Sequence, residues 1–160
     1  PAVHDVARLA QNGILWAANT EDLPEPHNRV TLSSELVDGD GLPAPKIEYR
    51  ISENTRKILK FTVDRMAELH QAAGAVRVLT QEIWVDQPGH LLGTARMGDD
   101  PATSVVDSYG KTHDVDNLYI ADGSIFVTSG SANPTCTITA LALRVAKGLV
   151  EQVTARKAHA

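Results

Sequence analysis

The sequence predicts an α+β fold in which an antiparallel sheet forms one layer and helices pack on it. Residues 29–33 and 46–51 alternate polar and apolar side chains, as half-buried strands do. Residues 52–73 carry apolar side chains at helical spacing, and residues 75–85 form an apolar run that predicts another strand. Two strands, a helix and a further strand in this order place sheet and helix in opposite layers.

The composition is that of an ordinary globular chain. With 160 residues, of which 42% are hydrophobic and 22% charged, the chain is long enough to form one domain with a core. The formal net charge of −5, without a cluster of Lys and Arg, argues against a nucleic-acid partner. The sequence shows neither a membrane-spanning run nor a signal-peptide pattern. The compartment is left unknown, with the cytoplasm and the periplasm both open for a longer parent protein.

The first half of the chain contains four further local signals. Apolar positions within residues 1–10 fit one face of a short helix, and residues 14–18 predict a buried strand. Ser52 or Asn54 can cap the long helix, and Gly74 ends it in the C′ position.

The second half is organised around residues 117–144, which predict a strand, a small-residue crossing and a long helix. Residues 118–121 are an apolar run that stops at an Asp-Gly pair, as a buried strand would. Asn133 and Pro134 then open the helix, because Asn is a favoured N-cap and Pro is tolerated at the first helical position. Beyond Val153 the composition predicts a frayed tail.

The beginning of this last helix favours negative charge. The backbone N–H groups of Thr135, Cys136 and Thr137 have no partner within the helix, and the helix dipole adds partial positive charge there. The alternative interpretation is a well-capped core helix that binds nothing. This stretch alone leaves both interpretations open.

Three side chains are candidates for chemistry, each with a plainer alternative. His90 follows a Pro-Gly break, where it could act as a base or be an ordinary loop residue. Cys136 could be a nucleophile paired with His90, although a free Cys is usually a small core side chain. Asp122 ends a predicted strand, where it could meet a ligand or simply form a turn.

Several kinds of site are not expected. None of the six histidines lies at metal-ligand spacing, and one cysteine can form neither an internal disulfide nor a thiolate cluster, so we expect no metal site. The chain also lacks G-x-G-x-x-G and G-x-x-x-x-G-K-[ST] motifs. The Gly-rich phosphate cradle of a nucleotide-binding fold is therefore missing.

Four segments together resemble the C-terminal portion of the glucose–methanol–choline (GMC) family of FAD-dependent oxidoreductases: LPEPHNRVTL, HLLGTARMG, SVVD and NLYIADGSIFVTSGSANPTCTITALALR. The specific element is H-x-x-G-T-x-R-M-G followed by A-D-G-S and N-P-T-x-T. The resemblance covers most of the chain, and KTHDVDNL with SGSANPT is most similar to the gluconate, sorbitol and fructose dehydrogenase branch.

The resemblance implies a fold of the FAD-linked reductase C-terminal domain type. Residues 1–116 would form a substrate-binding domain whose antiparallel sheet roofs the flavin. Residues 117–160 would be the last strand and helix of an FAD-binding domain that lies mostly outside this chain. We therefore expect the C-terminal part of a longer enzyme, inert by itself, whose uncovered apolar surface favours self-association in the absence of the N-terminal FAD-binding portion.

The resemblance also assigns roles to residues. His90 matches the family's active-site histidine and would take the hydroxyl proton while a hydride passes from the substrate CH–OH carbon to flavin N5. Asn133 matches the second active-site position and would hold the substrate oxygen. The segments that match the family's flavin contacts are Asp122-Gly123 and Asn133-Pro134-Thr135. Cys136 stands where Leu is usual, which predicts a packed position.

Two other functions remain as alternatives to the oxidoreductase. The first is a non-catalytic binding or interaction domain that reuses this fold, and the second is a hydrolase that uses Cys136 with His90. The oxidoreductase implies FAD, a small alcohol substrate and a possible electron-acceptor partner.

Overall fold

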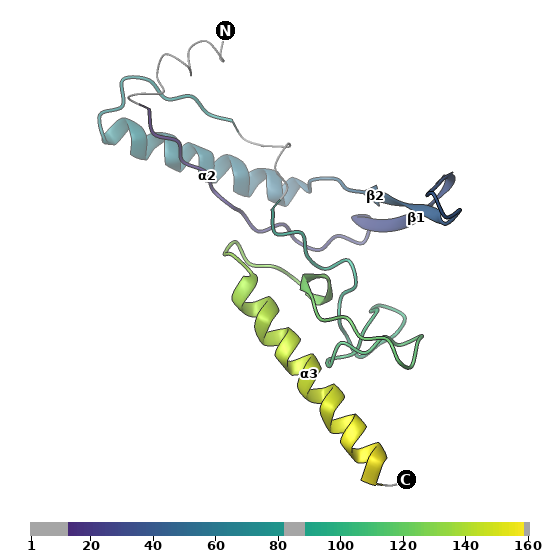
Figure 1. The fold of residues 1–160 in the computed structure, drawn as a ribbon. Helices are drawn as coiled ribbons and strands as arrows, with labels where there is room; N and C mark the ends of the chain where they lie inside the picture. The colour runs from purple at the N-terminus through teal and green to yellow at the C-terminus, as the bar shows by residue number, and fades with distance from the viewer. Residues whose placement is uncertain (1–12, 82–88, 159–160) are drawn as a thin grey trace.

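The structure is a computed structural model, and it describes residues 13–81 and 89–158. Figure 1 shows two parts that meet near the middle of the molecule. We call residues 13–81 the hairpin–helix part, because a β-hairpin and a long helix dominate it. We call residues 89–158 the core part, because its loops pack against the last helix and enclose the buried side chains.

The hairpin is made of β1 (Arg29–Val37) and β2 (Pro43–Glu48), which pair antiparallel. The two alternating segments therefore form strands as predicted, although the second lies a few residues earlier than expected. Asp38 closes the turn, because its Oδ1 accepts hydrogen bonds from the backbone N–H groups of Asp40 and Leu42, both at 2.9 Å.

The two faces of the hairpin differ in character. On one face, Leu32 and Ile47 are 72% and 75% exposed. On the other face, Arg29 and Lys46 both form ion pairs with Glu48, at 2.9 and 3.0 Å. The hairpin thus leaves an apolar surface uncovered among the described residues.

Helix α2 spans Glu53–Ala72 and follows the predicted signals closely. The Ser52 hydroxyl accepts a hydrogen bond from the Thr55 N–H at 3.1 Å, which makes Ser52 the N-cap. Past the other end, Gly74 has a φ of 88°, in the left-handed region where glycine ends helices.

Two strands predicted in this part are wrong. Residues 14–18 form no strand because they run along α2, where the Trp16 ring lies 4.4 Å from the His70 ring between centroids. Residues 75–81 form no strand either. The rest of that predicted strand, and the short helix predicted within residues 1–10, lie outside the described residues.

The core part consists of loops, the short 3-10 helix η1 (Gly123–Ile125) and helix α3 (Thr135–Ala158). Its centre is formed by Val106, Ile125 and Val145, which are at most 5% exposed. Helix α3 begins one residue later than predicted, and it continues to Ala158, so the predicted fraying beyond Val153 is wrong.

Backbone bridges hold the loops of the core part together in place of strands. Val106 bridges both Met97 and Thr112, and Lys111 bridges Tyr119. The buried strand predicted at residues 118–121 is therefore wrong. In this segment only Tyr119 takes part in a β-bridge, with Lys111, and a single bridge does not make a strand.

The α+β content agrees with the predicted fold class, with two long helices and one hairpin among the described residues. Among the described residues, neither α2 nor α3 packs across the hairpin. This differs from the prediction, in which helices form a layer on the sheet. Neither of these helices combines the length and the apolar character that crossing a bilayer requires.

Candidate functional site

The predicted base, His90, lies at the beginning of a segment that is fixed by backbone hydrogen bonds. His90 itself is exposed and has a φ of 57°, the left-handed region that non-glycine residues rarely occupy. Three residues on, Gly93 has a φ of 83° and turns the chain towards η1. Such strain at a non-glycine residue is typical of functional loops.

Three consecutive hydrogen bonds join the His90 segment to η1. The N–H groups of Gly93, Ala95 and Met97 donate to three successive carbonyls of η1, at 3.2, 2.8 and 2.9 Å. The backbone after His90 is therefore in fixed register with the segment that the family resemblance assigns to the flavin.

Gly123 is the point at which the predicted site segments converge. A Cβ atom at Gly123 would lie 2.5 Å from Leu92 Cδ2 and 3.3 Å from Ile138 Cδ1. Leu92 is two residues from His90, and Ile138 lies in the first turn of α3. The absence of a side chain at Gly123 thus lets the His90 segment, η1 and the beginning of α3 meet. The sequence motifs had not indicated Leu92 or Ile138.

Asp122 caps η1 and carries a stabilised negative charge. Its Oδ1 accepts a hydrogen bond from the Ser124 N–H at 2.7 Å. The Ser124 hydroxyl, and then this backbone bond, lower the pKa of Asp122 below its ordinary value. Asp122 is exposed, so its second carboxylate oxygen can accept a further hydrogen bond.

The N-terminus of α3 completes the site. The Pro134 carbonyl accepts the first helical hydrogen bond, from the Ile138 N–H at 2.9 Å, so the helix begins after Pro134 and not after Asn133 as predicted. Asn133 and Thr135 are exposed on either side of Pro134. The first N–H groups of the helix point out of its end and attract partial negative charge.

Cys136 is exposed, which corrects the predicted packed position. Among the described residues, no hydrogen bond links its thiol to His90. A nucleophile and its base need such a contact, so the structure gives no support to the hydrolase alternative.

Two other features lie outside this arrangement. Within residues 13–81 and 89–158, no group of His, Cys, Asp and Glu could hold a metal ion. An open cleft of about 760 Å³ lies at the base of the hairpin, between His27, Arg29, Tyr49 and Arg50, and it contains none of the predicted site residues.

Comparisons with known proteins identify a family. A family model described as GMC oxidoreductase matches residues 24–142. The 2-methyl-1,2-propanediol dehydrogenase of Mycolicibacterium austroafricanum is 42% identical over 125 residues, which cover 78% of this chain and 23% of that protein. The fructose dehydrogenase large subunit of Gluconobacter japonicus is 34% identical, over 93% of this chain and 27% of that protein.

A third relative is matched over nearly the whole chain. The 6'''-hydroxyparomomycin C oxidase of Streptomyces lividus is 40% identical over 159 residues, which cover 98% of this chain and 28% of that protein. The chain thus spans about a quarter of the length of the curated relatives it matches.

Proposed function

This chain belongs to the GMC oxidoreductase family, and from that membership we propose that it is the C-terminal substrate-binding and catalytic part of an FAD-dependent enzyme that oxidises the CH–OH group of an alcohol, sugar or polyol. The observation that carries the proposal is the convergence at Gly123, where the His90 segment, η1 and the first turn of α3 meet. The names of three relatives, a 2-methyl-1,2-propanediol dehydrogenase, a fructose dehydrogenase large subunit and a 6'''-hydroxyparomomycin C oxidase, support a CH–OH donor as the substrate.

The exposed groups around Gly123 fit one end of a flavin. The N-terminus of α3 offers N–H donors and partial positive charge, which suit the electron-rich pyrimidine edge. Asp122 offers an ionised carboxylate that can accept hydrogen bonds from ribityl hydroxyl groups. The sequence carries no Gly-rich cradle for the pyrophosphate, so that end must be held by other polypeptide.

A bound flavin would supply the acceptor for the hydride that leaves the substrate carbon. His90, exposed at the strained start of its segment, would take the proton of the substrate hydroxyl. Asn133 would donate a hydrogen bond to the substrate oxygen and so orient the carbon that is oxidised. The α3 N-terminus would stabilise negative charge that develops beside it.

We propose further that residues 1–116 and 117–160 act as a substrate-binding domain and as the closing segment of an FAD-binding domain. The two would be adjoining units, because the Lys111–Tyr119 bridge and the core of Val106, Ile125 and Val145 cross this boundary. The uncovered apolar face of the hairpin supports a further contact for the first unit, because exposed apolar surface of this kind usually meets other polypeptide. The rest of a longer protein would supply that polypeptide, since the curated relatives are about three and a half times as long as this chain.

The test begins with the coding sequence upstream of Pro1, where a Gly-rich dinucleotide motif is expected. The protein encoded by the whole reading frame is then purified and its visible spectrum recorded under anaerobic conditions with a panel of simple alcohols, polyols and sugars. An alcohol should bleach the flavin band, and His90→Ala should slow the bleaching by about 10²-fold or more. His27→Ala is the matched control, because His27 is exposed at the base of the hairpin. A colourless protein that takes up no added FAD would overturn the proposal.

A further inference from the structure

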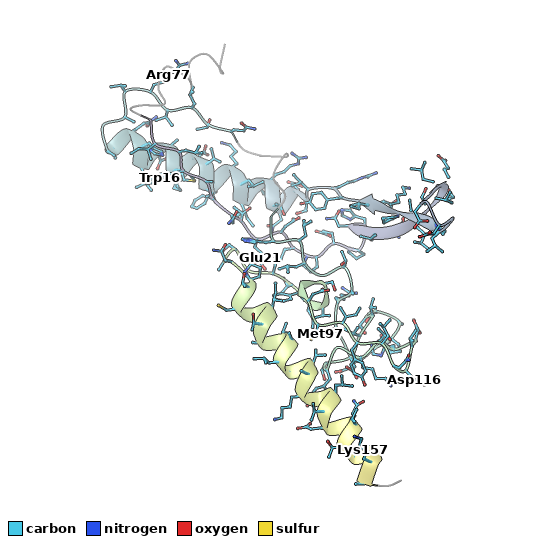
Figure 2. All side chains as sticks on the ribbon, in the orientation of Figure 1. Trp16, Glu21, Arg77, Met97, Asp116 and Lys157 are labelled. Carbon is cyan, nitrogen blue, oxygen red and sulfur yellow. The ribbon has the colours of Figure 1, made fainter. Side chains whose placement is uncertain are left out.

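The linker that precedes the hairpin is held at both ends of α2. At one end, the Trp16 ring packs against the ring of His70 in the last turn of the helix, with centroids 4.4 Å apart and the planes tilted by 49°. At the other end, Asp22 Oδ1 accepts a hydrogen bond from the Thr55 hydroxyl at 2.6 Å, in the first turn. Figure 2 shows Trp16 against α2 and Glu21 at the junction with the core part.

The lengths show that this linker runs alongside most of α2. Residues 55 to 70 of a helix span roughly 22 Å at 1.5 Å per residue. Residues 16 to 22 can reach at most roughly 20–22 Å when extended, and the four contacting side chains bridge part of the distance. We call residues 16–22 the strap.

Asp22 joins the strap to the hairpin as well as to the helix. Its Oδ2 accepts a hydrogen bond from the Tyr49 hydroxyl, just beyond β2. Thr55 is only 4% exposed, and its hydroxyl also lies 2.9 Å from the hydroxyl of the N-cap Ser52. Although Tyr49 is 57% exposed overall, partial desolvation of its hydroxyl, and after it the carboxylate of Asp22, raise the pKa of Tyr49 to about 12. The hydroxyl therefore stays protonated, as a hydrogen-bond donor, over the physiological range.

The residue next to Asp22 reaches the other part of the molecule. Glu21 Oε1 accepts a hydrogen bond from the Thr128 hydroxyl at 3.2 Å. Thr128 begins the small-residue loop that leads to Asn133, and with the described residues it makes the one hydrogen bond found over residues 128–133. Burial agrees with this contact, because residues 20–22 are half-buried while residues 13–19 are exposed.

We propose that the acidic pair Glu21 and Asp22 is a joint that fixes the hairpin–helix part relative to the loop carrying Asn133. Asp22 fastens the strap to α2 and the hairpin, and Glu21 fastens it to Thr128. On the proposed function, Asn133 orients the substrate hydroxyl, so the joint sets where the hairpin–helix part lies over that hydroxyl. Glu21 and Thr128 are then positioning residues, which act through the loop and not on the substrate.

The test measures the distance between the two parts directly and needs no cofactor. One spin label is attached to Cys136, which is exposed and is the only cysteine, and a second to Lys57→Cys on α2, where the Lys57 side chain is 73% exposed. Pulsed electron–electron double resonance is recorded on labelled chain diluted into an excess of unlabelled chain, so that distances between associated copies contribute little, and it should give one narrow distance distribution. Thr128→Val and Glu21→Ala should each lower the ratio of joined to open molecules by about tenfold, because each removes one hydrogen bond to a carboxylate.

Conservative variants separate the joint from a general loss of structure. Thr128→Ser and Glu21→Gln keep a donor and an acceptor at these positions and should restore the narrow distribution. Glu25→Ala is the matched control in the same linker, because the Glu25 side chain forms no hydrogen bond with the described residues. A broad distribution in the unmodified chain, or an unchanged one in Thr128→Val, would overturn the proposal. Failure to bind FAD would overturn the proposed function and leave the joint untouched.

Discussion

The hairpin–helix part holds a regular helix and the described sheet, whereas the core part is, apart from α3, a set of loops, turns and single bridges. The buried side chains, in contrast, lie mostly in the core part. Among the described residues of the hairpin–helix part, Thr55 alone is buried, while Val106, Ile125 and Val145 are enclosed in the core part. Figure 1 shows the same contrast, with the hairpin projecting and the loops gathered beside α3.

The difference shows what fixes the geometry of the candidate site. His90 and Asp122 both lie on loops, yet these loops are joined by backbone hydrogen bonds and rest on a packed core. A loop that is supported in this way can hold functional groups as firmly as a helix does. The hairpin–helix part has regular hydrogen bonds but little packing, so its placement depends on the strap and on what covers its apolar face.

The sharpest test of the comparison makes the same substitution in both parts. Ile125→Ala, at 1% exposure, should lower the free energy of unfolding by about 3 kcal/mol, because the lost side chain leaves a cavity. Ile47→Ala, at 75% exposure, should change it by less than about 0.5 kcal/mol. Urea unfolding followed by circular dichroism measures both. Equal losses would mean that the two parts do not differ in packing as described.

A second pair of variants separates packing from backbone strain. Gly110 and Gly41 have φ values of 72° and 81°, so an Ala at either position is strained by about 1 kcal/mol. At Gly110 the new Cβ would also lie 2.5 Å from the Ile120 carbonyl oxygen, whereas at Gly41 it would meet nothing within 4 Å. Gly110→Ala should therefore cost about 1–3 kcal/mol more than Gly41→Ala in the same unfolding measurement. Equal losses of unfolding free energy in the two variants would show that the backbone and side chains around Gly110 shift readily to accommodate the added Cβ.

The uncovered face of the hairpin predicts self-association. In sedimentation velocity, the chain should form concentration-dependent oligomers through the surface that contains Leu32 and Ile47. The double variant Leu32→Thr, Ile47→Thr keeps strand propensity and should weaken association by about tenfold. Thr31→Ala, on the opposite face next to Lys46, should leave association unchanged. Association that survives the double variant would place the contact elsewhere.

Local signals in the sequence predicted the elements that depend on local forces. The cap at Ser52, the end at Gly74 and the start of α3 to within one residue follow from side chains adjacent to each helix end. The strand predicted at residues 14–18 failed because a strand needs a partner, and α2 occupies this segment instead. Periodicity describes one segment and carries no information about which segment lies beside it.

The candidate site shows the same division. The motifs indicated His90, Asp122 and Asn133, but the exposure of Cys136 was not predicted, because burial depends on what packs against a helix. The convergence at Gly123 was not predictable either, since it brings together Leu92 and Ile138 from distant segments. The family resemblance supplied the residues, and the structure supplied the contacts that bring their segments together.

The smallest expected effect concerns the pKa of Asp122, at the edge of the candidate site. It tests whether the nearby residue Ser124 sets the charge of this carboxylate. A carboxyl whose pKa is lowered by folding contributes stability above its ordinary pKa, and that stability is lost as the pH falls through the lowered value. Ser124→Ala removes the hydroxyl that contributes most to the lowering, so the pKa of Asp122 should rise towards its ordinary value.

Carbon-detected NMR titration of the Asp122 carboxyl measures this shift. Ser124→Thr keeps the hydroxyl and should restore the low pKa of Asp122, whereas the Ser124 backbone bond persists in both variants. Because Asp122 is exposed, the accompanying change in unfolding free energy should be too small to separate the variants, and the titration midpoint is the informative quantity. An unchanged midpoint in Ser124→Ala would mean that the loop contacts of η1 do not set the charge of Asp122. The contrast between a firmly built site and an open hairpin–helix part would then rest on packing alone.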